Sequence, residues 1–236
     1  MCCDKTNLSF GIKKIPSIVN LSLNIVVSFE ESSKFIELDE GFDFYAPQTF
    51  EDEQHRRILW AWMGLGDTSP EYSNPTVARG WQHAATVPRE LHVRNQQLIQ
   101  APLAELQQLR DEPKKGILQL TVEGSEIAIE ELKFELQLEA CPSIEHLTIN
   151  LLQDTKIQYQ NGVLSLKHGV SGYGRKSRSI AVESLEQIQI LVDSSSIELF
   201  INRGEKCLTS RVYPKKRDVV KVSGIGQVDF SWWSLS

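Results

Sequence analysis

The sequence predicts an all-β protein built in two parts. Apolar and polar residues alternate with a period of two along many short segments, which is typical of strands with one buried face. After residue 115, turn-forming residues recur about every ten positions, a spacing that favours an antiparallel sandwich. One credible helix is predicted, within Leu98–Arg110, and it separates the two parts.

The first part begins with a segment that has no clear pattern. Residues 1–19 show no period and are left unassigned, whereas the alternation over 20–27 predicts a strand. A further strand is expected at 35–38, and residues 42–50 are aromatic and end near a turn. The run Arg57–Met63 is almost continuously apolar, which indicates a strand buried on both faces.

A long loop and two more strands complete the first part. Residues 64–80 are rich in Gly, Pro, Asp, Ser and Asn, and loops of this length are often functional. Strands are predicted at 81–87 and 91–93, with a turn at 94–97. The first part therefore extends over residues 20–100.

A short linker helix is predicted over residues 101–112. Pro102 suits its first turn, and Leu103, Leu106 and Leu109 form one apolar face at spacings of three. Pro113 prevents the helix from continuing.

The second part, residues 113–236, consists of short strands. Leu or Ile alternates with Gln, Glu or Lys, which indicates one buried and one wet face. Asn161-Gly162 is a hairpin signal. The strands are expected near 117–122, 132–138, 147–151, 157–159, 163–166, 188–192, 197–201 and 208–213.

Charge argues against a nucleic-acid partner. The net charge is −6, and the two basic clusters, at 175–178 and 215–217, are interpreted as solvated loops. No apolar run is long enough to span a bilayer, and no leader pattern is visible. A cytoplasmic protein without membrane contact is expected.

Cysteine and histidine indicate neither a metal site nor a cofactor. The four cysteines match no zinc pattern, and no pair among the five histidines has ligand spacing. Cys207 lies in an alternating run and is predicted to be a buried thiol. A reducing compartment is the simplest interpretation.

Four segments resemble glycoside hydrolase family 32, which contains the β-fructofuranosidases, invertases and sucrose-6-phosphate hydrolases. They occur in the family's order, and the resemblance covers about residues 20–236. The segments are LDEGFDFYAPQTF at 38–50, RRILWAWMG at 56–64, GWQHAATVPREL at 80–91 and VDSSSIELFIN at 192–202.

This resemblance implies a five-bladed β-propeller followed by a β-sandwich. The matching segments belong to the C-terminal part of the propeller, residues 20–100, and to the whole sandwich, residues 113–236. It also implies a retaining hydrolysis of β-fructofuranosyl bonds through a fructosyl-enzyme intermediate, for which two carboxyl groups lie about 5 Å apart.

The family's three carboxylate motifs do not occur in these 236 residues. They are W-M-N-D-P-N-G with the nucleophile, R-D-P with a stabilising Asp, and E-C-P with the acid/base. Three partial matches fail at one position each. The pairs Arg110-Asp111 and Arg217-Asp218 lack the following Pro, and Cys141-Pro142 lacks the preceding Glu. No catalytic residue is assigned, and the chain is expected to be an inactive fragment.

The resemblance implies three substrate-binding residues. Asp43 would bond to the sugar or position the acid/base, Tyr45 lies beside it in the motif, and Trp62 would stack on a sugar face. The alternatives are a strand-end Asp, a packed Tyr and a core Trp. Trp81 and Arg89 match structural positions of the family.

Three functions remain open from the sequence. The chain is the C-terminal portion of an enzyme, a non-catalytic sugar-binding or assembly module, or a split reading frame without independent function. The expected partner is a small sugar: sucrose, sucrose-6-phosphate or another fructoside. The oligomeric state stays open.

Overall fold

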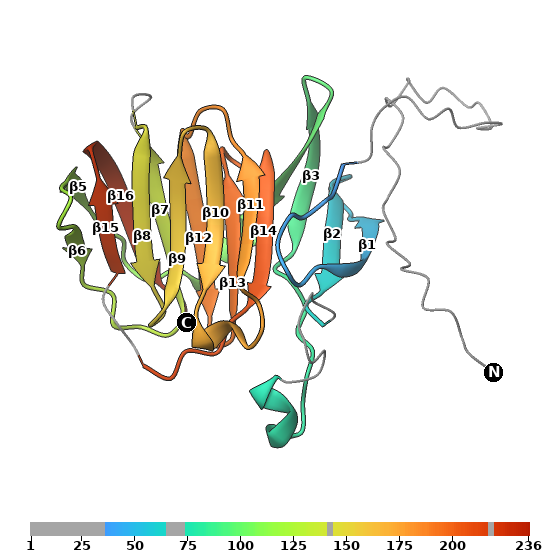
Figure 1. Ribbon diagram of the computed structural model, residues 1–236. Helices are drawn as coiled ribbons and strands as arrows, with labels where there is room; N and C mark the ends of the chain where they lie inside the picture. The colour runs from blue at the N-terminus through green and yellow to red at the C-terminus, as the bar shows by residue number, and fades with distance from the viewer. Residues whose placement is uncertain (1–35, 65–73, 141–143, 217–219) are drawn as a thin grey trace, which may run out of the picture. The chain divides into compact units, whose positions relative to one another are not determined.

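The computed structural model describes residues 36–64, 74–140, 144–216 and 220–236 (Figure 1). By its contacts, Asp39–Ser236 is one compact unit. The predictions for residues 1–19 and 20–27 lie outside the described residues. The strand expected at 35–38 is not formed by residues 36–38, which have no strand pairing.

The first sheet is a four-stranded antiparallel meander. Its strands are paired in chain order, the arrangement of one propeller blade. They are β1 (Tyr45–Glu51), β2 (Arg57–Trp62), β3 (Arg89–Arg94) and β4 (Gln97–Pro102).

Strand β2 is buried along one face and only at Ile58 on the other, so the prediction of burial on both faces is wrong for the rest of the strand. Leu59, Ala61 and Met63 are buried, whereas Trp60 and Trp62 are 49% and 56% exposed. Both tryptophans lie at alternate positions of the strand and therefore share a face. An apolar run shows which residues can be buried, but not which face a neighbour covers.

The strand predicted at 81–87 is largely absent, and only Ala85 pairs, in an isolated bridge with Trp62. The flanking backbone still follows β2, since the Met63 amide donates to the Ala84 carbonyl at 2.7 Å and the Thr86 amide to the Ala61 carbonyl at 3.0 Å. Within the predicted loop, the described residues contain the 3-10 helix η1 (Pro75–Arg79).

The linker contains a helix, but it is the 3-10 helix η2 (Ala104–Leu109) rather than a helix over 101–112. The spacing of three between Leu103, Leu106 and Leu109 matches the three residues per turn of this helix type. Pro102 ends strand β4 instead of starting the helix. In the described part of the chain, no helix is long and apolar enough to cross a membrane.

The rest of the chain is a sandwich of two six-stranded sheets, seen face to face in Figure 1. One has the order β11-β10-β9-β8-β15-β6, and the other, called sheet C, has the order β14-β13-β12-β7-β16-β5. A short 3-10 helix, η3 (Val170–Gly172), follows β10. The strands are β5 (Lys114–Leu120), β6 (Ser125–Ile127), β7 (Phe134–Ala140), β8 (His146–Leu151), β9 (Thr155–Gln160), β10 (Val163–His168), β11 (Ser177–Ala181), β12 (Gln187–Asp193), β13 (Ser196–Ile201), β14 (Lys206–Arg211), β15 (Val220–Gly224) and β16 (Gly226–Ser234).

The core lies between these two sheets and consists of the alternate apolar residues predicted from the sequence. Leu136, Ile190 and Leu199 of sheet C are fully buried, as are Ile149 and Leu164 of the opposite sheet. Because each strand alternates, the outward positions of sheet C are free to carry polar residues. This outer face of sheet C is where the first sheet and the linker pack.

The predicted hairpin at Asn161-Gly162 is confirmed. The two residues join β9 and β10 with φ angles of 51° and 74°, the left-handed values that a tight hairpin turn needs.

Candidate functional site

An exposed aromatic face lies on the hairpin of β1 and β2. Tyr45 is the register partner of Trp62, and Gln48 that of Trp60, so these side chains point to one side of the sheet. Tyr45 is 41% exposed and Trp62 56%. We call Tyr45, Trp60 and Trp62 the aromatic face.

Local features position the two predicted residues of this face. A bulge lies between Tyr45 and Gln48, with Ala46 at a φ of 46°. It shifts the strand register, which places Tyr45 on the same face as Trp62 at the start of β1. The ring of Trp62 meets that of His83 edge-on, with centroids 5.7 Å apart. Exposed indole and phenol rings can pack on the apolar face of a sugar and offer polar edges.

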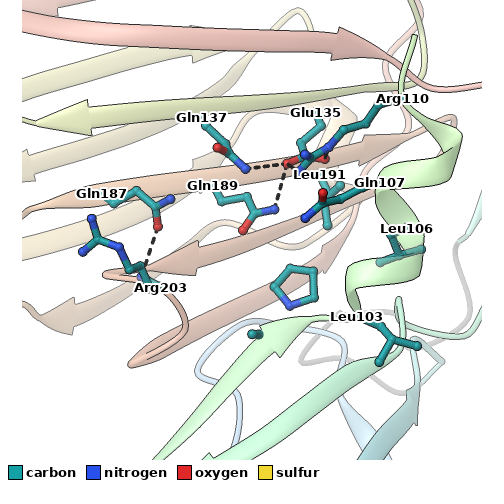
Figure 2. A pocket seen from close by; sticks show the side chains of 12 residues that line it. Leu103, Leu106, Gln107, Arg110, Glu135, Gln137, Gln187, Gln189, Leu191 and Arg203 are labelled. Atoms are coloured by element: carbon teal, nitrogen blue, oxygen red, sulfur yellow. Dashed lines mark hydrogen bonds and ion pairs between the residues drawn. The ribbon is translucent and has the colours of Figure 1, made fainter. Parts of the chain in front are cut away.

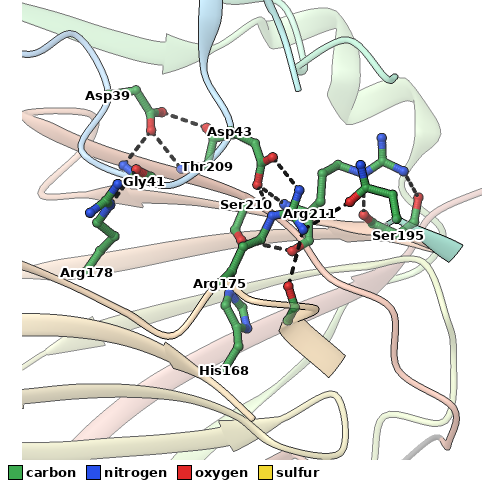
Figure 3. Close-up of polar contacts among 12 residues, drawn as sticks. Asp39, Gly41, Asp43, His168, Arg175, Arg178, Ser195, Thr209, Ser210 and Arg211 are labelled. Atoms are coloured by element: carbon green, nitrogen blue, oxygen red, sulfur yellow. Dashed lines mark hydrogen bonds and ion pairs between the residues drawn. The ribbon is translucent and has the colours of Figure 1, made fainter. Parts of the chain in front are cut away.

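Asp43, the third predicted residue, is completely buried, in contrast to the exposed Tyr45 and Trp62. Figure 3 shows its carboxylate directed towards Arg175 and Arg211. Its Oδ1 accepts from Arg175 Nη2 at 2.7 Å, and its Oδ2 accepts from Arg175 Nε at 2.5 Å. The Arg211 amide donates to the same Oδ2 at 2.8 Å. With both oxygens occupied, this carboxylate has the geometry of a structural ion pair.

The partner of Asp43 corrects the interpretation of residues 175–178 as a solvated loop. Arg175 is 1% exposed and also donates to Asn74 Oδ1 at 3.2 Å. Arg178 lies in β11, donates to the Gly41 carbonyl at 3.0 Å and stacks over Phe42. The carboxylate that neutralises Arg175 is 132 residues earlier in the chain, so local composition could not reveal the pair.

In the other basic cluster, Lys215 and Lys216 are exposed, as predicted for a solvated loop. Arg217 lies outside the described residues.

Arg89 is the centre of a second buried polar cluster. Its Nη1 donates to Asp39 and Gln100, both at 3.0 Å. Its Nη2 donates to Glu198 at 2.8 Å and to Thr209 at 2.6 Å.

Two phenyl rings enclose the same guanidinium. Its central carbon lies 4.9 Å from the Phe44 centroid and 5.0 Å from that of Phe200. Cation–π contacts of this kind favour a desolvated guanidinium over an ammonium.

The electrostatics keep Arg89 charged. Burial acts to lower its pKa, but the carboxylates of Asp39 and Glu198 outweigh burial and raise the pKa above its ordinary value. Burial raises the pKa of Glu198, and the Arg89 charge opposes that shift. A buried pair of this kind needs hydrogen bonds to offset its desolvation, and here both terminal nitrogens of Arg89 donate to acceptors, whereas its Nε has no hydrogen-bond partner among the described residues.

These two clusters join the first sheet to the sandwich. Asp39 and Asp43 come from the first of the family-like segments, Arg89 from the third and Glu198 from the fourth. We call this region the polar joint; it consists of Asp39, Asp43, Arg89, Arg175, Glu198, Thr209 and Arg211. The sequence did not indicate the roles of Arg175, Thr209 and Arg211, because the partners that place them in the joint are more than 100 residues away.

Trp81 lies at the edge of the polar joint. It is 43% exposed, and the Arg211 guanidinium lies 5.2 Å from its ring centroid. Arg211 Nη1 also donates to the Gln82 carbonyl at 3.3 Å. This arrangement gives Trp81 a packing role.

The described residues contain no group of three His, Cys, Asp or Glu side chains that could hold a metal ion. Cys207 is buried, as predicted, and burial raises the pKa of its thiol to about 12. A thiol with this pKa is a poor nucleophile. Cys2, Cys3 and Cys141 lie outside the described residues.

Comparison with protein families assigns both parts of the chain. Residues 22–102 match the glycosyl hydrolases family 32 N-terminal domain, and residues 105–231 match the glycosyl hydrolases family 32 C-terminal domain. The chain therefore belongs to glycosyl hydrolase family 32, as its four segments predicted.

Individual relatives agree with this assignment. The chain is 35% identical over 211 residues to a sucrose-6-phosphate hydrolase of Bacillus subtilis (strain 168), covering 86% of this chain and 43% of that protein. It is 33% identical over 208 residues to a sucrose-6-phosphate hydrolase of Salmonella typhimurium, with 84% and 41% covered. The chain spans less than half the length of these relatives.

Solved structures show the same fold. The sucrose-6-phosphate hydrolase of Lactobacillus gasseri superposes with a TM-score of 0.75 at 23% identity, over 87% of this chain and 44% of that one. A β-fructofuranosidase of Bombyx mori gives a TM-score of 0.68 at 25% identity, over 85% and 42%. The predicted all-β architecture, part of a propeller followed by a sandwich, is confirmed.

Proposed function

We propose that this chain forms one aromatic wall of a fructoside site, together with the sandwich that supports it, in a glycoside hydrolase of the β-fructofuranosidase type. The observation that carries the proposal is the register pairing of Tyr45 with Trp62, both exposed on a sheet that matches the family's N-terminal domain. Rings in this position can stack on a sugar but cannot cleave its glycosidic bond.

The chemistry of the family needs carboxyl groups that these residues do not provide. A retaining glycosidase uses one carboxylate as the nucleophile and one carboxylic acid as the proton donor. None of the three carboxylate motifs occurs in the sequence, and Asp43 is saturated by Arg175 and Arg211. We infer that the 236-residue chain by itself does not hydrolyse fructosides.

Within the site, the roles divide between contact and support. Trp62 and Tyr45 would contact the sugar. Asp43, through its pair with Arg175, would hold the segment that leads into β1. The named activity of the relatives favours sucrose-6-phosphate as the substrate of the complete site, and a Bombyx mori β-fructofuranosidase variant has been solved in complex with sucrose.

A second candidate function is a non-catalytic sugar-binding module. The aromatic face favours it, because stacking needs no carboxylate. The two functions make different predictions. A sugar-binding module would bind the sugar without hydrolysing it, whereas part of an enzyme would show hydrolysis once the segments with the carboxylate motifs are also present.

The first experiment measures turnover by the purified chain. Fructose release from sucrose and from sucrose-6-phosphate is compared with a buffer blank, and we expect no difference. Turnover that disappears in Asp43→Asn, in a sample shown by circular dichroism to be folded, would contradict the proposal, because a supporting carboxylate would then be catalytic. Turnover that is unchanged in Asp43→Asn would come either from contaminating host invertase or from an acid outside the motifs. Repurification distinguishes the two, because it removes the activity of a contaminant.

The second experiment measures sugar binding at the aromatic face. Sucrose is titrated while tryptophan fluorescence is recorded, and Trp62→Ala should remove the response. Val93→Ala is the matched control, because Val93 is 59% exposed on β3 of the same sheet. An equal response in Trp62→Ala would show that the aromatic face does not bind the sugar.

A further inference from the structure

A pocket of about 150 Å³ lies between the linker and the outer face of sheet C, and no residue of the aromatic face lines it (Figure 2). One wall comes from the end of β4, from Leu103 just before η2, and from Leu106 within η2. The other comes from β7 and β12, with Gln137, Gln189 and Leu191. The pocket therefore has one largely apolar wall and one wall rich in amides.

The charge inside the pocket is already neutralised. Glu135, 1% exposed, accepts from Arg110 Nε at 2.8 Å and from Arg110 Nη2 at 2.6 Å. Its Oε1 also accepts from the amide nitrogens of Gln137 and Gln189, both at 2.8 Å. A carboxylate with four donors has little capacity left for a cation.

The cationic side chains of the pocket are likewise engaged. Arg110 is held by Glu135, and its guanidinium stacks 4.2 Å from the Trp233 centroid. At the rim, Arg203 lies 3.3 Å from Glu139 and 3.4 Å from Glu186. An anion would therefore compete with carboxylates that already occupy both guanidinium groups, which favours an uncharged ligand.

The same network orients two acceptors. Gln137 and Gln189 are register partners on adjacent strands, so their side chains rise side by side from one face. Since each amide nitrogen donates to Glu135, the two amide oxygens turn away from it and can accept from a ligand. Gln187 is oriented the other way. Its side-chain oxygen accepts from the Arg203 backbone amide, which leaves its side-chain nitrogen to donate to a ligand.

We propose that this pocket is a second carbohydrate site, which binds one ring of a neutral sugar. Adjacent hydroxyls would donate to the oxygens of Gln137 and Gln189, and the C–H face of the ring would pack on Leu103 and Leu106. The volume is below the roughly 300–1,000 Å³ of pockets for drug-sized ligands, which favours one ring. The proposal stands independently of the aromatic face and of hydrolysis.

The test is a titration of the full chain with sucrose and with fructose, followed through the side-chain amide signals in NMR spectra. Gln137→Met removes an amide while keeping the side-chain length, and Leu106→Trp fills the pocket. Gln119→Met is the matched control: Gln119 lies in β5 of the same sheet, bonds to Gln227 and does not line the pocket.

We expect saturable shifts of the Gln137 and Gln189 amides in the unchanged chain and in Gln119→Met. The affinity should fall by about tenfold or more, about 1.4 kcal/mol, in Gln137→Met and in Leu106→Trp. Trp62→Ala should leave these shifts intact, which separates this site from the aromatic face. Leu106→Trp also guards against a misfolded Gln137→Met, because Leu106 takes no part in the Glu135 network.

Three outcomes would overturn the proposal. The first is that the amide signals of Gln137 and Gln189 do not shift at millimolar sugar. The second is that the affinity is unchanged in both Gln137→Met and Leu106→Trp. The third is that inorganic phosphate displaces the sugar, which would indicate an anion site.

Discussion

At the scale of single residues, buried arginine determines much of the interior. Arg89, Arg175 and Arg211 are among the largest fully buried side chains of the described residues. Each donates to at least one acceptor from a distant part of the chain, so hydrogen bonds offset part of the cost of burying the charge. Arginine suits this role because its planar guanidinium group can donate to two or more acceptors while its flat surface packs on aromatic rings.

His168 is a buried residue whose protonation should affect stability. Its Nδ1 lies 2.9 Å from Thr155 Oγ1 and its Nε2 lies 3.1 Å from Ser210 Oγ. Burial, assisted by the nearby Arg175 charge, lowers its pKa to about 4, although Asp154 and Asp43 oppose the shift. The ring is therefore neutral in the folded protein at pH 7.

We predict that His168 makes the folded protein less stable as the pH falls from about 6.5 towards 4. In this window the unfolded chain binds a proton at His168 and the folded chain does not, so protonation favours unfolding. At pH 5 the loss from this group is about 2 kcal/mol relative to pH 7. Urea unfolding at both pH values measures it.

The control is His168→Gln, which keeps a polar side chain at this position and leaves all carboxylates and the other histidines in place. Its stability should change less between pH 7 and pH 5 than that of the unchanged chain. An identical loss in both proteins would assign the pH dependence to the carboxylates instead.

At the scale of elements, one tight turn fixes the approach of the first sheet to the sandwich. Asn202, Arg203 and Gly204 connect β13 to β14 with φ angles of 49°, 59° and 93°. The Gln100 amide of β4 donates to the Gly204 carbonyl at 3.0 Å, and a Cβ on Gly204 would overlap the Gln100 backbone. Glycine is needed here both for its φ and for the close contact.

We predict that Gly204→Ala is more destabilising than Gly80→Ala by about 1–3 kcal/mol. Both glycines have positive φ, but a Cβ on Gly80 would have no atom within 4 Å. The comparison therefore isolates the contact with Gln100 from the backbone strain, which is about 1–2 kcal/mol for either alanine. Urea midpoints provide the measurement, and equal values would show that β4 can move away.

Elements also differ in how well the sequence predicted them. The sandwich strands with strict alternation and the hairpin at Asn161-Gly162 were predicted, since both signals are local. Strand β11 was missed because its start is basic and was interpreted as a loop. The segment 81–87 was predicted as a strand from its apolar residues, but tertiary contacts place only Ala85 in a bridge.

At the scale of the whole compact unit, the polar joint couples the first sheet to the sandwich. The Val87 amide donates to Glu198 at 2.7 Å, and the Thr209 amide donates to Asp39 at 2.8 Å. Together with the Asp43–Arg175 pair, these bonds are directional, so they favour one arrangement of the two parts over others.

We predict that Asp43→Asn destabilises the protein by about 3–5 kcal/mol, because it leaves the Arg175 charge buried without a counter-charge. Arg203→Ala is the control: its pairs with Glu139 and Glu186 are exposed, and its loss should cost at most about 1 kcal/mol. Chemical denaturation measures both. A cost for Asp43→Asn as small as that of Arg203→Ala would show that the ion pair does not stabilise the joint.

Local sequence patterns were enough to predict the all-β class, the buried thiol of Cys207 and the family. Periodicity, turn-forming residues and signature segments are local features, so they can be recognised in the sequence alone. Three features became visible in the three-dimensional structure alone: Arg175 is buried against Asp43, Tyr45 and Trp62 share an exposed face, and amides of sheet C line a pocket. These features depend on contacts between residues far apart in the chain, and neither composition nor period specifies which distant partner a side chain meets.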